Sequence, residues 1–257
     1  MPKVWLVGAG PGAPDLLTVR ALRLIERADI VFHDALVHPE TLALATNARL
    51  VDVGKRNGKL STEQRFINRA IVEAARSHPT VVRLKGGDPM LFGRAQEEID
   101  ALKDAGVEVE VVPGITAALA ASAELGISLT RRGVARTVAF ATPRVGREED
   151  ASDWLQAAAA ADTAVLYMAS GQATGIAQAL IDAGRQPGTP VALVESASLP
   201  GSRHSVGTLA ELSRIAPEFH GGPALLCVGE VFEAARGHPL SGEADLPEPR
   251  FAARRAS

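Results

Sequence analysis

Between Val81 and Arg94 the chain reads Val-Val-Arg-Leu-Lys-Gly-Gly-Asp-Pro-Met-Leu-Phe-Gly-Arg. The β-branched and apolar residues at its start are typical of a short buried strand, and the two glycines after them allow a ligand to approach the backbone closely. From Leu91 a second apolar pattern predicts a helix that ends at Gly106, because glycine suits the C-terminal cap of a helix. An open α/β sheet binds its ligand at such a strand–loop–helix junction, although a simple tight turn explains these residues about as well.

The same alternation of strand and helix runs along the whole chain. Repeated alternation favours parallel sheets covered by helices, and it starts afresh after residue 136. We therefore expect an α/β protein made of two α/β domains with mainly parallel sheets and a ligand cleft between them. The expected parts are an N-terminal domain at 1–113, a connecting helix and linker at 114–136, a C-terminal domain at 137–235 and a disordered tail at 236–257.

The amino-acid composition of the chain limits the classes of function that it can have. The 257 residues are 46% hydrophobic, enough to bury a sizeable core. A net charge of −3 and an aromatic content of 4% argue against a nucleic-acid partner. No apolar run approaches the ~20 residues of a membrane helix, so we expect a soluble, cytoplasmic protein with no membrane partner. The single cysteine, Cys227, excludes an intramolecular disulfide and a Cys-rich metal site, and no metal is expected.

The glycine-rich loop after the first strand has two interpretations. The pattern Gly8-x-Gly10-x-x-Ala13 satisfies the dinucleotide fingerprint, and Asp34 follows at the ~20 residues where such folds place a ribose-binding carboxylate. An NAD-dependent dehydrogenase is therefore one alternative. Pro11 weighs against it, because proline lacks the N–H that would help to hold a pyrophosphate.

Charged residues at strand ends indicate an anionic ligand. Asp34 is interpreted as a ribose ligand, a catalytic carboxylate or a solvated strand end, and Lys55-Arg56 as a ligand-binding pair or a solvated loop. These residues would share one edge of the sheet with Gly86-Gly87-Asp88. A second basic cluster near the domain connection fits a polycarboxylate or phosphate better than nucleic acid. It consists of Arg131, Arg132, Arg136, Arg144 and Arg147.

Taken together, these motifs resemble the tetrapyrrole methylase family. The resemblance covers residues 3–235 in order. It rests on Val-Gly-Ala-Gly-Pro-Gly at 7–12, Asp-Ala-Leu-Val at 34–37, Val-Gly-Lys-Arg at 53–56, Arg-Leu-Lys-Gly-Gly-Asp-Pro at 83–89, Val-Val-Pro-Gly-Ile-Thr-Ala at 111–117, Leu-Thr-Arg-Arg-Gly-Val-Ala-Arg at 129–136, Tyr-Met at 167–168 and Pro-Val-Ala-Leu-Val-Glu at 190–195. It accounts for Pro11, since this family binds S-adenosylmethionine between two α/β domains without a pyrophosphate turn.

The resemblance implies a reaction. It points to S-adenosylmethionine-dependent C-methylation of uroporphyrinogen III at C2 and C7, giving precorrin-2 for sirohaem or cobalamin biosynthesis. A later precorrin or cobalt-precorrin C-methyltransferase of the same fold is the nearest alternative. The dehydrogenase and a non-catalytic tetrapyrrole carrier are alternatives from other classes. The resemblance also implies a homodimer.

The resemblance further assigns roles to single residues. Asp34 aligns with the proposed general base of the family and Lys55 with its proposed general acid. Arg131, Arg132 and Arg144 are expected to bind the carboxylates of the tetrapyrrole, and Arg131 and Arg144 stand where the family usually has histidine. The residues expected to contact the cofactor are Pro11, Gly86, Gly87, Asp88, Leu91, Thr116, Ala117, Met168 and Ala197.

Overall fold

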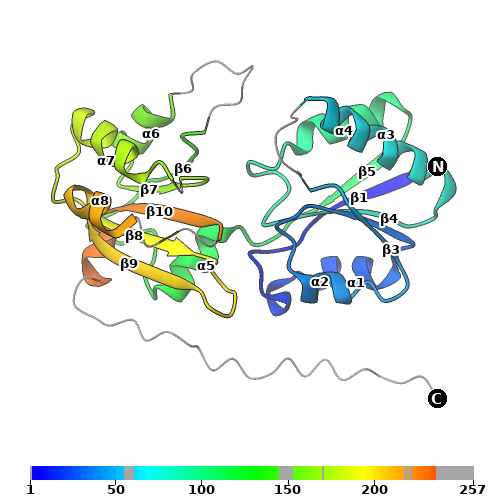
Figure 1. Ribbon diagram of the computed structural model, residues 1–257, viewed down its shortest axis with the longest axis horizontal. Coiled ribbons are helices and arrows are strands. Elements are labelled where there is room, and N and C mark those ends of the chain that lie inside the picture. The colour runs from blue at the N-terminus through cyan, green and yellow to red at the C-terminus, as the bar shows by residue number, and fades with distance from the viewer. Residues whose placement is uncertain are drawn as a thin grey trace.

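The computed structural model describes residues 2–54, 61–144, 153–169, 171–216, 219 and 222–235. Within them the chain forms two α/β bodies, each built on its own five-stranded sheet (Figure 1). The first sheet uses strands that precede residue 113 and the second uses strands that follow residue 137. The expectation of two α/β domains is thereby confirmed. The domain limits at 113 and 136 remain proposals.

The first sheet is parallel throughout and has the strand order β3-β2-β4-β1-β5. Its strands are β1 (Lys3–Gly8), β2 (Ile30–His33), β3 (Arg49–Asp52), β4 (Val81–Lys85) and β5 (Glu108–Val112). One face is covered by α1 (Val19–Arg27) and α2 (Pro39–Ala43), and the other by α3 (Ser61–Ser77) and α4 (Ala95–Asp104) (Figure 1). A short 3-10 helix, η1 (Pro14–Leu16), follows the first loop.

The central strand β4 contributes to both faces, because side chains alternate along a strand. Val82 and Leu84 pack with the α1 and α2 side, and Val81 packs with the α3 and α4 side. Arg83 and Lys85 lie on this second side as well, and they are buried despite their charge. The strand therefore carries two cations into the interior where it approaches its carboxyl end.

The second sheet is mixed, with the strand order β6-β7-β10-β8-β9. Its strands are β6 (Val138–Ala141), β7 (Thr163–Leu166), β8 (Pro190–Glu195), β9 (Arg203–Thr208) and β10 (Ala224–Gly229). β6 and β7 pair in parallel, whereas β10 runs antiparallel between β7 and β8, and β9 is antiparallel to β8. This arrangement puts the last strand of the chain inside the sheet.

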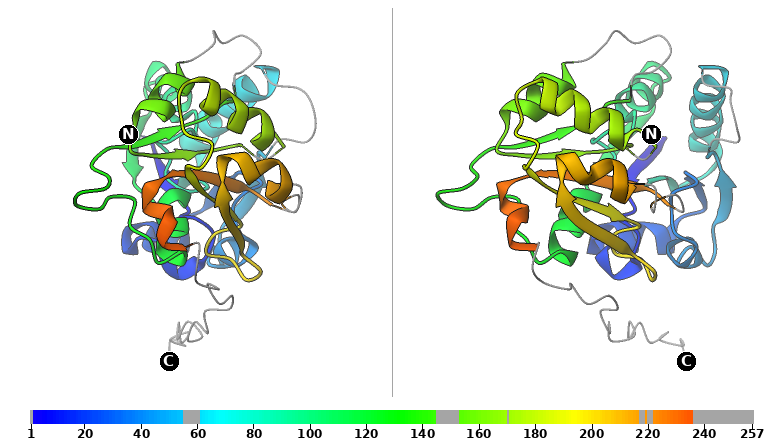
Figure 2. Two further views of the ribbon diagram at one scale, coloured as in Figure 1. Left: turned by 90° about the vertical axis from the view of Figure 1, so that its left-hand side faces the viewer. Right: turned by 60° about the vertical axis from the view of Figure 1, so that its left-hand side comes forward.

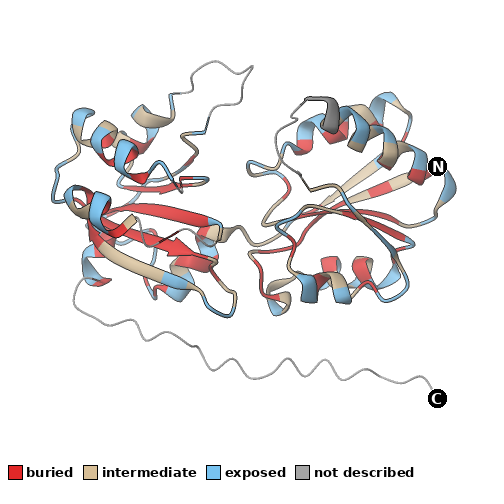
Figure 3. Cartoon of the chain, viewed as in Figure 1, coloured by how far each residue is buried: buried red, intermediate tan, exposed pale blue. Residues whose placement is uncertain are grey.

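Helices cover both faces of the second sheet as well. One face packs against α6 (Trp154–Ala160), α7 (Ala173–Asp182) and α8 (Leu212–Ile215), which follows the 3-10 helix η2 (Leu209–Glu211). The other face packs against α5 (Ala117–Glu124) and the 3-10 helix η4 (Glu230–Ala235). Figure 2 shows the same layers from two further sides, and Figure 3 shows that the buried residues concentrate in the two sheets and the inner sides of their helices.

The structure corrects one prediction near the glycine loop. The helix expected from Leu91 begins only at Ala95. Phe92 and Arg94 both have a φ of 54°, in the left-handed region that a helix cannot include, so residues 91–94 form a turn ahead of α4. The tail at 236–257 lies outside the described residues. No helix within the described residues is long and apolar enough to cross a membrane.

Candidate functional site

Three loops meet at the carboxyl edge of the first sheet. The backbone N–H of Gly87 donates a hydrogen bond to the carbonyl oxygen of Gly10 over 2.6 Å, and the N–H of Gly10 returns one to Gly87 over 3.2 Å. The N–H of Ala9 also donates to the carbonyl oxygen of Lys85 over 2.7 Å. These bonds join the glycine-rich loop after β1 to the Gly-Gly-Asp loop after β4.

The loop after β5 joins the same group through Asp88. One carboxylate oxygen of Asp88 accepts a hydrogen bond from the N–H of Gly114 over 2.9 Å, and the other accepts from the N–H of Met90 over 2.8 Å. Gly8 and Gly114 lie so close that a Cβ atom on Gly8 would stand 2.6 Å from the Cα of Gly114. Only glycine fits this crossing of backbones.

Tyr167 connects this edge to the second domain. Its hydroxyl lies 2.6 Å from the hydroxyl of Thr116, and it accepts a hydrogen bond over 3.2 Å from the N–H of Ala118, in the first turn of α5. The ring of Phe92, from the turn before α4, lies 5.0 Å from the ring of Tyr167. Burial of Tyr167 raises the pKa of its phenol above the ordinary value, although the bonds to Thr116 and Ala118 act in the opposite direction.

A second connection lies at the loop after β8. Ser198 and Ser196 have φ values of 72° and 55°, which place them in the left-handed region that few residues other than glycine adopt. The hydroxyl of Ser198 accepts a hydrogen bond from the N–H of Ala13 over 3.1 Å. Met168, next to Tyr167, has a φ of 56° and is exposed. Residues other than glycine with backbone in the left-handed region occur frequently at binding sites.

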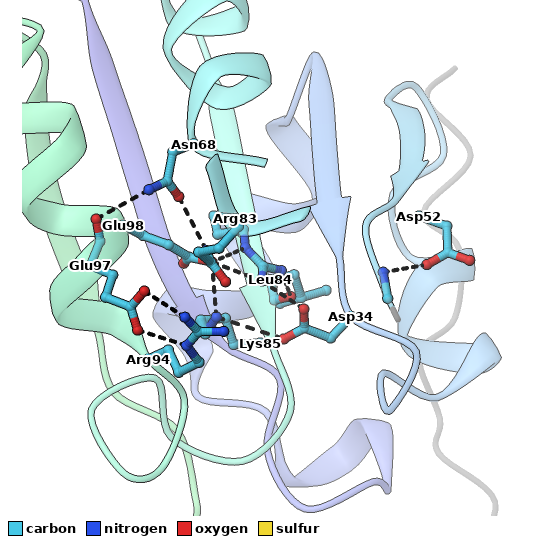
Figure 4. Close-up of polar contacts among 11 residues, drawn as sticks. Asp34, Asp52, Asn68, Arg83, Leu84, Lys85, Arg94, Glu97 and Glu98 are labelled. Carbon is cyan, nitrogen blue, oxygen red and sulfur yellow. Dashed lines mark hydrogen bonds and ion pairs between the residues drawn. The ribbon is translucent and has the colours of Figure 1, made fainter. Parts of the chain in front are cut away.

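A buried group of charges lies beside the loops, at the ends of β2 and β4 (Figure 4). Arg83, Lys85 and Glu98 are 2%, 4% and 1% exposed, and the Asp34 side chain is 30% exposed. The Arg83 guanidinium lies 2.6 Å from Asp34 and 3.0 Å from Glu98, and the Lys85 ammonium lies 3.1 Å from Glu98 and 3.8 Å from Asp34. Burial and the neighbouring Arg83 hold the pKa of Lys85 below its ordinary value.

The structure brings most of the predicted cofactor residues into this one region. Gly87 is bonded to the loop that contains Pro11, Asp88 to the loop that leads to Thr116, and Thr116 to the residue before Met168. Ala197 lies between the two strained serines of the loop that contacts Ala13. Gly86, Leu91 and Ala117 adjoin members of the same set.

The predicted catalytic and substrate residues are less closely grouped. Asp34 lies at the carboxyl end of β2, beside the charged group, whereas Lys55 lies outside the described residues. Arg131, Arg132 and Arg144 are exposed, and their guanidinium groups make no hydrogen bond or ion pair with any other described residue. Arg131 and Ala135 pair through their backbones in a small hairpin.

Sequence reasoning did not assign a role to Arg83, Lys85, Glu98 or Ser198. The sequence does contain a signal for the first three. Arg83 and Lys85 lie two residues apart in a buried strand. Glu98 lies on the buried face of α4 together with Ala95, Ile99 and Leu102. Ser198 carries no comparable signal. No group of three or more His, Cys, Asp or Glu within the described part of the chain is arranged to hold a metal.

Comparison with known proteins identifies the fold and the family. The model of the tetrapyrrole (corrin/porphyrin) methylases matches residues 3–213. A uroporphyrinogen-III C-methyltransferase of Pseudomonas aeruginosa is 44% identical over 240 residues, which are 93% of this chain and 98% of that protein. The structure also superposes with a TM-score of 0.78 on uroporphyrin-III C-methyl transferase from Thermus thermophilus complexed with S-adenyl homocysteine, at 42% identity, covering 90% of this chain and 99% of that one.

A longer relative matches over one part of its length. A siroheme synthase of Psychrobacter is 45% identical over 231 residues, which are 89% of this chain and 47% of that protein. The chain therefore spans about half the length of this relative. With the family model covering most of both domains, the chain belongs to the tetrapyrrole (corrin/porphyrin) methylase family.

Proposed function

We propose that the chain transfers methyl groups from S-adenosylmethionine to C2 and C7 of uroporphyrinogen III and so makes precorrin-2. The observation that carries the proposal is the meeting of the Pro11 loop, the Gly86-Gly87-Asp88 loop and Thr116 at one sheet edge, joined to Met168 through Tyr167. The substrate of the Pseudomonas relative and the ligand of the Thermus structure support this choice of substrate and methyl donor.

The residues at this edge fit S-adenosylmethionine. Gly86 and Gly87 expose backbone without a Cβ, and Gly87 has a φ of 67°, so a ligand can lie directly against the peptide. The exposed Met168 offers an apolar contact, and it follows Tyr167, whose hydroxyl lies 2.6 Å from that of Thr116. We assign the binding of the cofactor to these residues together with Pro11, Asp88, Leu91, Ala117 and Ala197. Bound there, S-adenosylmethionine supplies an electrophilic methyl group.

Asp34 is the carboxylate available for proton handling. Methylation of a pyrrole carbon requires that the macrocycle then lose a proton, and a positioned carboxylate accelerates that step. Asp34 is partly exposed while its two oxygens face the cations Arg83 and Lys85. Methyl transfer itself depends on position and on exclusion of water more than on a strong base. We propose Asp34 as the general base and Lys55 as the general acid.

Apolar and cationic side chains suit the two parts of a tetrapyrrole substrate. Large apolar side chains are exposed on the loops of this edge, namely Leu36, Met90 and Phe92, and Met168 is exposed after β7 of the second sheet. They can contact the faces of a macrocycle, whereas guanidinium groups bind its carboxylates in paired hydrogen bonds. We propose that Arg131, Arg132 and Arg144 bind those carboxylates. We further propose that the protein is cytoplasmic and forms a homodimer. Sedimentation at micromolar concentration tests the homodimer, because it distinguishes a dimer from a monomer.

Two titrations and one assay test the proposed reaction. We expect the chain to bind S-adenosylhomocysteine saturably and NAD not at all, and to methylate uroporphyrinogen III twice with S-adenosylmethionine. Saturable NAD binding without S-adenosylhomocysteine binding would support a dehydrogenase. Binding of S-adenosylhomocysteine with methylation of a precorrin or cobalt-precorrin, and none of uroporphyrinogen III, would show the later methyltransferase of the same fold.

A further inference from the structure

One oxygen atom of Glu98 anchors the buried charged group. Oε1 of Glu98 accepts a hydrogen bond from Nε of Arg83 over 3.0 Å, from Nζ of Lys85 over 3.1 Å and from Nε2 of Gln64 over 3.3 Å. The other oxygen, Oε2, is buried and has no hydrogen-bond partner among the described residues. A carboxylate in such a place is costly, because an ionised group loses its hydration on burial.

The two cations that contact Glu98 also face Asp34. Nη2 of Arg83 lies 2.6 Å from Oδ1 of Asp34, and Nζ of Lys85 lies 3.8 Å from Oδ2. Nη1 of Arg83 donates to the carbonyl oxygen of Leu84 over 3.1 Å, which fixes the guanidinium against its own strand. Each oxygen of Asp34 is thus opposite a cation, and both cations are tied to the same oxygen of Glu98 (Figure 4).

The charges of this group balance only when Glu98 is included. Arg83 and Lys85 carry two positive charges in the interior, and Asp34 and Glu98 carry two negative charges. Without the charge of Glu98, Asp34 alone would face two buried cations. Its carboxylate would then be held more tightly toward the interior, and it would accept a proton less readily.

We propose that Glu98 is a positioning residue, which through Arg83 and Lys85 holds the carboxylate of Asp34 at the sheet edge for proton transfer. The inference rests on the proposed role of Asp34 in proton transfer. Among the described residues, the charged groups that face Asp34 are Arg83 and Lys85 of β4, with Glu98 of α4 behind them. Nδ1 of His33, the preceding residue, lies 3.3 Å from the carbonyl oxygen of Asp34. Glu98 reaches the reaction only through these groups.

Glu98→Gln tests the inference, because glutamine keeps the shape and one acceptor oxygen but removes the charge. We expect kcat for methylation to fall by about tenfold, a part of what general base catalysis contributes. We also expect the acidic limb of the pH profile of kcat to move about one unit toward lower pH. Affinity for S-adenosylhomocysteine should stay within about twofold, because the hydrogen bonds of Glu98 within the described part of the chain go to Gln64, Arg83 and Lys85 and not to the cofactor loops.

Ile99→Val is the matched control, since Ile99 is the buried neighbour of Glu98 in α4 and carries no charge. It should lower stability modestly and leave the pH profile in place. In an Asp34→Asn background, Glu98→Gln should have no further effect on kcat. If Glu98→Gln does not fold, Arg83→Lys provides the second test. Lysine lacks the guanidinium fork through which Arg83 donates from Nε to Glu98 and from Nη2 to Asp34 at the same time, so this variant too should lower kcat.

The outcomes separate the inference from the proposed function. A wild-type protein that binds S-adenosylhomocysteine but does not methylate uroporphyrinogen III would refute the function, and the inference with it. An active wild type whose Glu98→Gln variant keeps its kcat and pH profile would overturn the inference alone. Full additivity of Glu98→Gln and Asp34→Asn would overturn it as well, because it would show that Glu98 acts independently of Asp34.

Discussion

Asp88 holds Gly114 in place: its carboxylate accepts the N–H of Gly114 over 2.9 Å, across 26 residues of chain. Its other oxygen accepts the N–H of Met90 over 2.8 Å, so the protein itself uses both oxygens. Asp88 therefore joins the loop after β4 to the loop after β5. Any bond that it makes to the cofactor comes in addition to this role.

Asp88→Asn tests what the hydrogen bonds from Asp88 to the backbone of Gly114 and Met90 contribute. Asparagine has one acceptor oxygen, so one of the two backbone N–H groups loses its partner, at a cost of about 1–3 kcal/mol. We expect a lower melting temperature and weaker binding of S-adenosylhomocysteine, measured by thermal unfolding and calorimetry. Asp100→Asn, an exposed carboxylate of α4, is the control and should change neither. Wild-type affinity in Asp88→Asn would show that the loops keep their places without this bond.

Gly114→Ala should be far more damaging than an alanine at another glycine. A Cβ on Gly114 would stand 2.9 Å from the Cα of Gly8 and closer still to the carbonyl oxygen of Gly87, and neither backbone can move aside. Gly175, in α7, has open space around it. Gly175→Ala should therefore leave stability unchanged or raise it by up to about 1 kcal/mol. Denaturant unfolding of both variants checks the contrast.

Gly87→Val should be harmful because of the backbone conformation of Gly87 and not because of a steric clash. A Cβ on Gly87 would find only the Cα of Thr116 at 3.9 Å, an ordinary contact, so the penalty comes from its φ of 67°. The left-handed region costs a residue with a Cβ about 1–2 kcal/mol, and a β-branched one more. The variant should fold and lose binding of S-adenosylhomocysteine. Normal binding would show that this loop is only a structural turn.

Arg144→Ala tests the proposed contact with the substrate. Removal of one charge-assisted bond should raise KM for uroporphyrinogen III, with a larger effect at low salt, where exposed charges are screened less. Arg214→Ala is the control, because Arg214 lies on α8 and pairs with Glu211 over 3.5 Å. Steady-state kinetics at two salt concentrations measures both. An unchanged KM would leave Arg144 as a solvated surface residue.

Cys227 should be chemically inert in the folded protein. It lies in the middle of the second sheet at 1% exposure, and burial raises the pKa of its thiol to about 12. At pH 8 only about one thiol in ten thousand would be ionised, and thiolate is the form that reacts. A thiol reagent should therefore label the protein only after denaturation. Rapid labelling of the native protein at pH 8 would show that β10 opens readily.

The carboxyl edge of the first sheet could be predicted because its signals are local. Gly86-Gly87-Asp88 follows an apolar strand directly, and the parallel order brings the loops after neighbouring strands together whatever the details of packing. The turn at Phe92 and Arg94 could not be predicted in the same way. The apolar pattern from Leu91 fits a helix, whereas the left-handed backbone of Phe92 and Arg94 accompanies a contact with Tyr167, which lies 75 residues further along the chain than Phe92.

The pairing of strands that lie far apart in the sequence could not be predicted from the sequence either. β10 lies between β7 and β8 and runs antiparallel to both, although nothing in residues 224–229 specifies a direction. The anchoring role of Glu98 depends on the helix face and on the register of β4 together, so neither segment alone reveals it. Sequence predicts the elements and the edge where they meet, whereas the partners of a buried charge follow from their packing.

Tyr167 offers a spectroscopic test of the connection between the domains, because it is the sole tyrosine of the chain. Its folded pKa lies above the value of 10.0 for an exposed phenol. The stability that comes from this shift is fully present below that value and is lost as the pH rises through the folded pKa. Absorbance of tyrosinate should thus appear in the native protein only at higher pH than in denatured protein.

Tyr167→Phe keeps the ring against Phe92 and removes the hydroxyl. The N–H of Ala118 then loses its side-chain partner and Thr116 its hydroxyl neighbour, so we expect a loss of about 1–2 kcal/mol in stability at neutral pH. We also expect weaker binding of S-adenosylhomocysteine, because Thr116 lies at the proposed cofactor site. The difference in stability from wild type should shrink above pH 10, where only the wild type has a phenol to ionise. A difference that stays constant up to the alkaline limit of folding would show that the hydroxyl of Tyr167 contributes nothing that depends on its protonation.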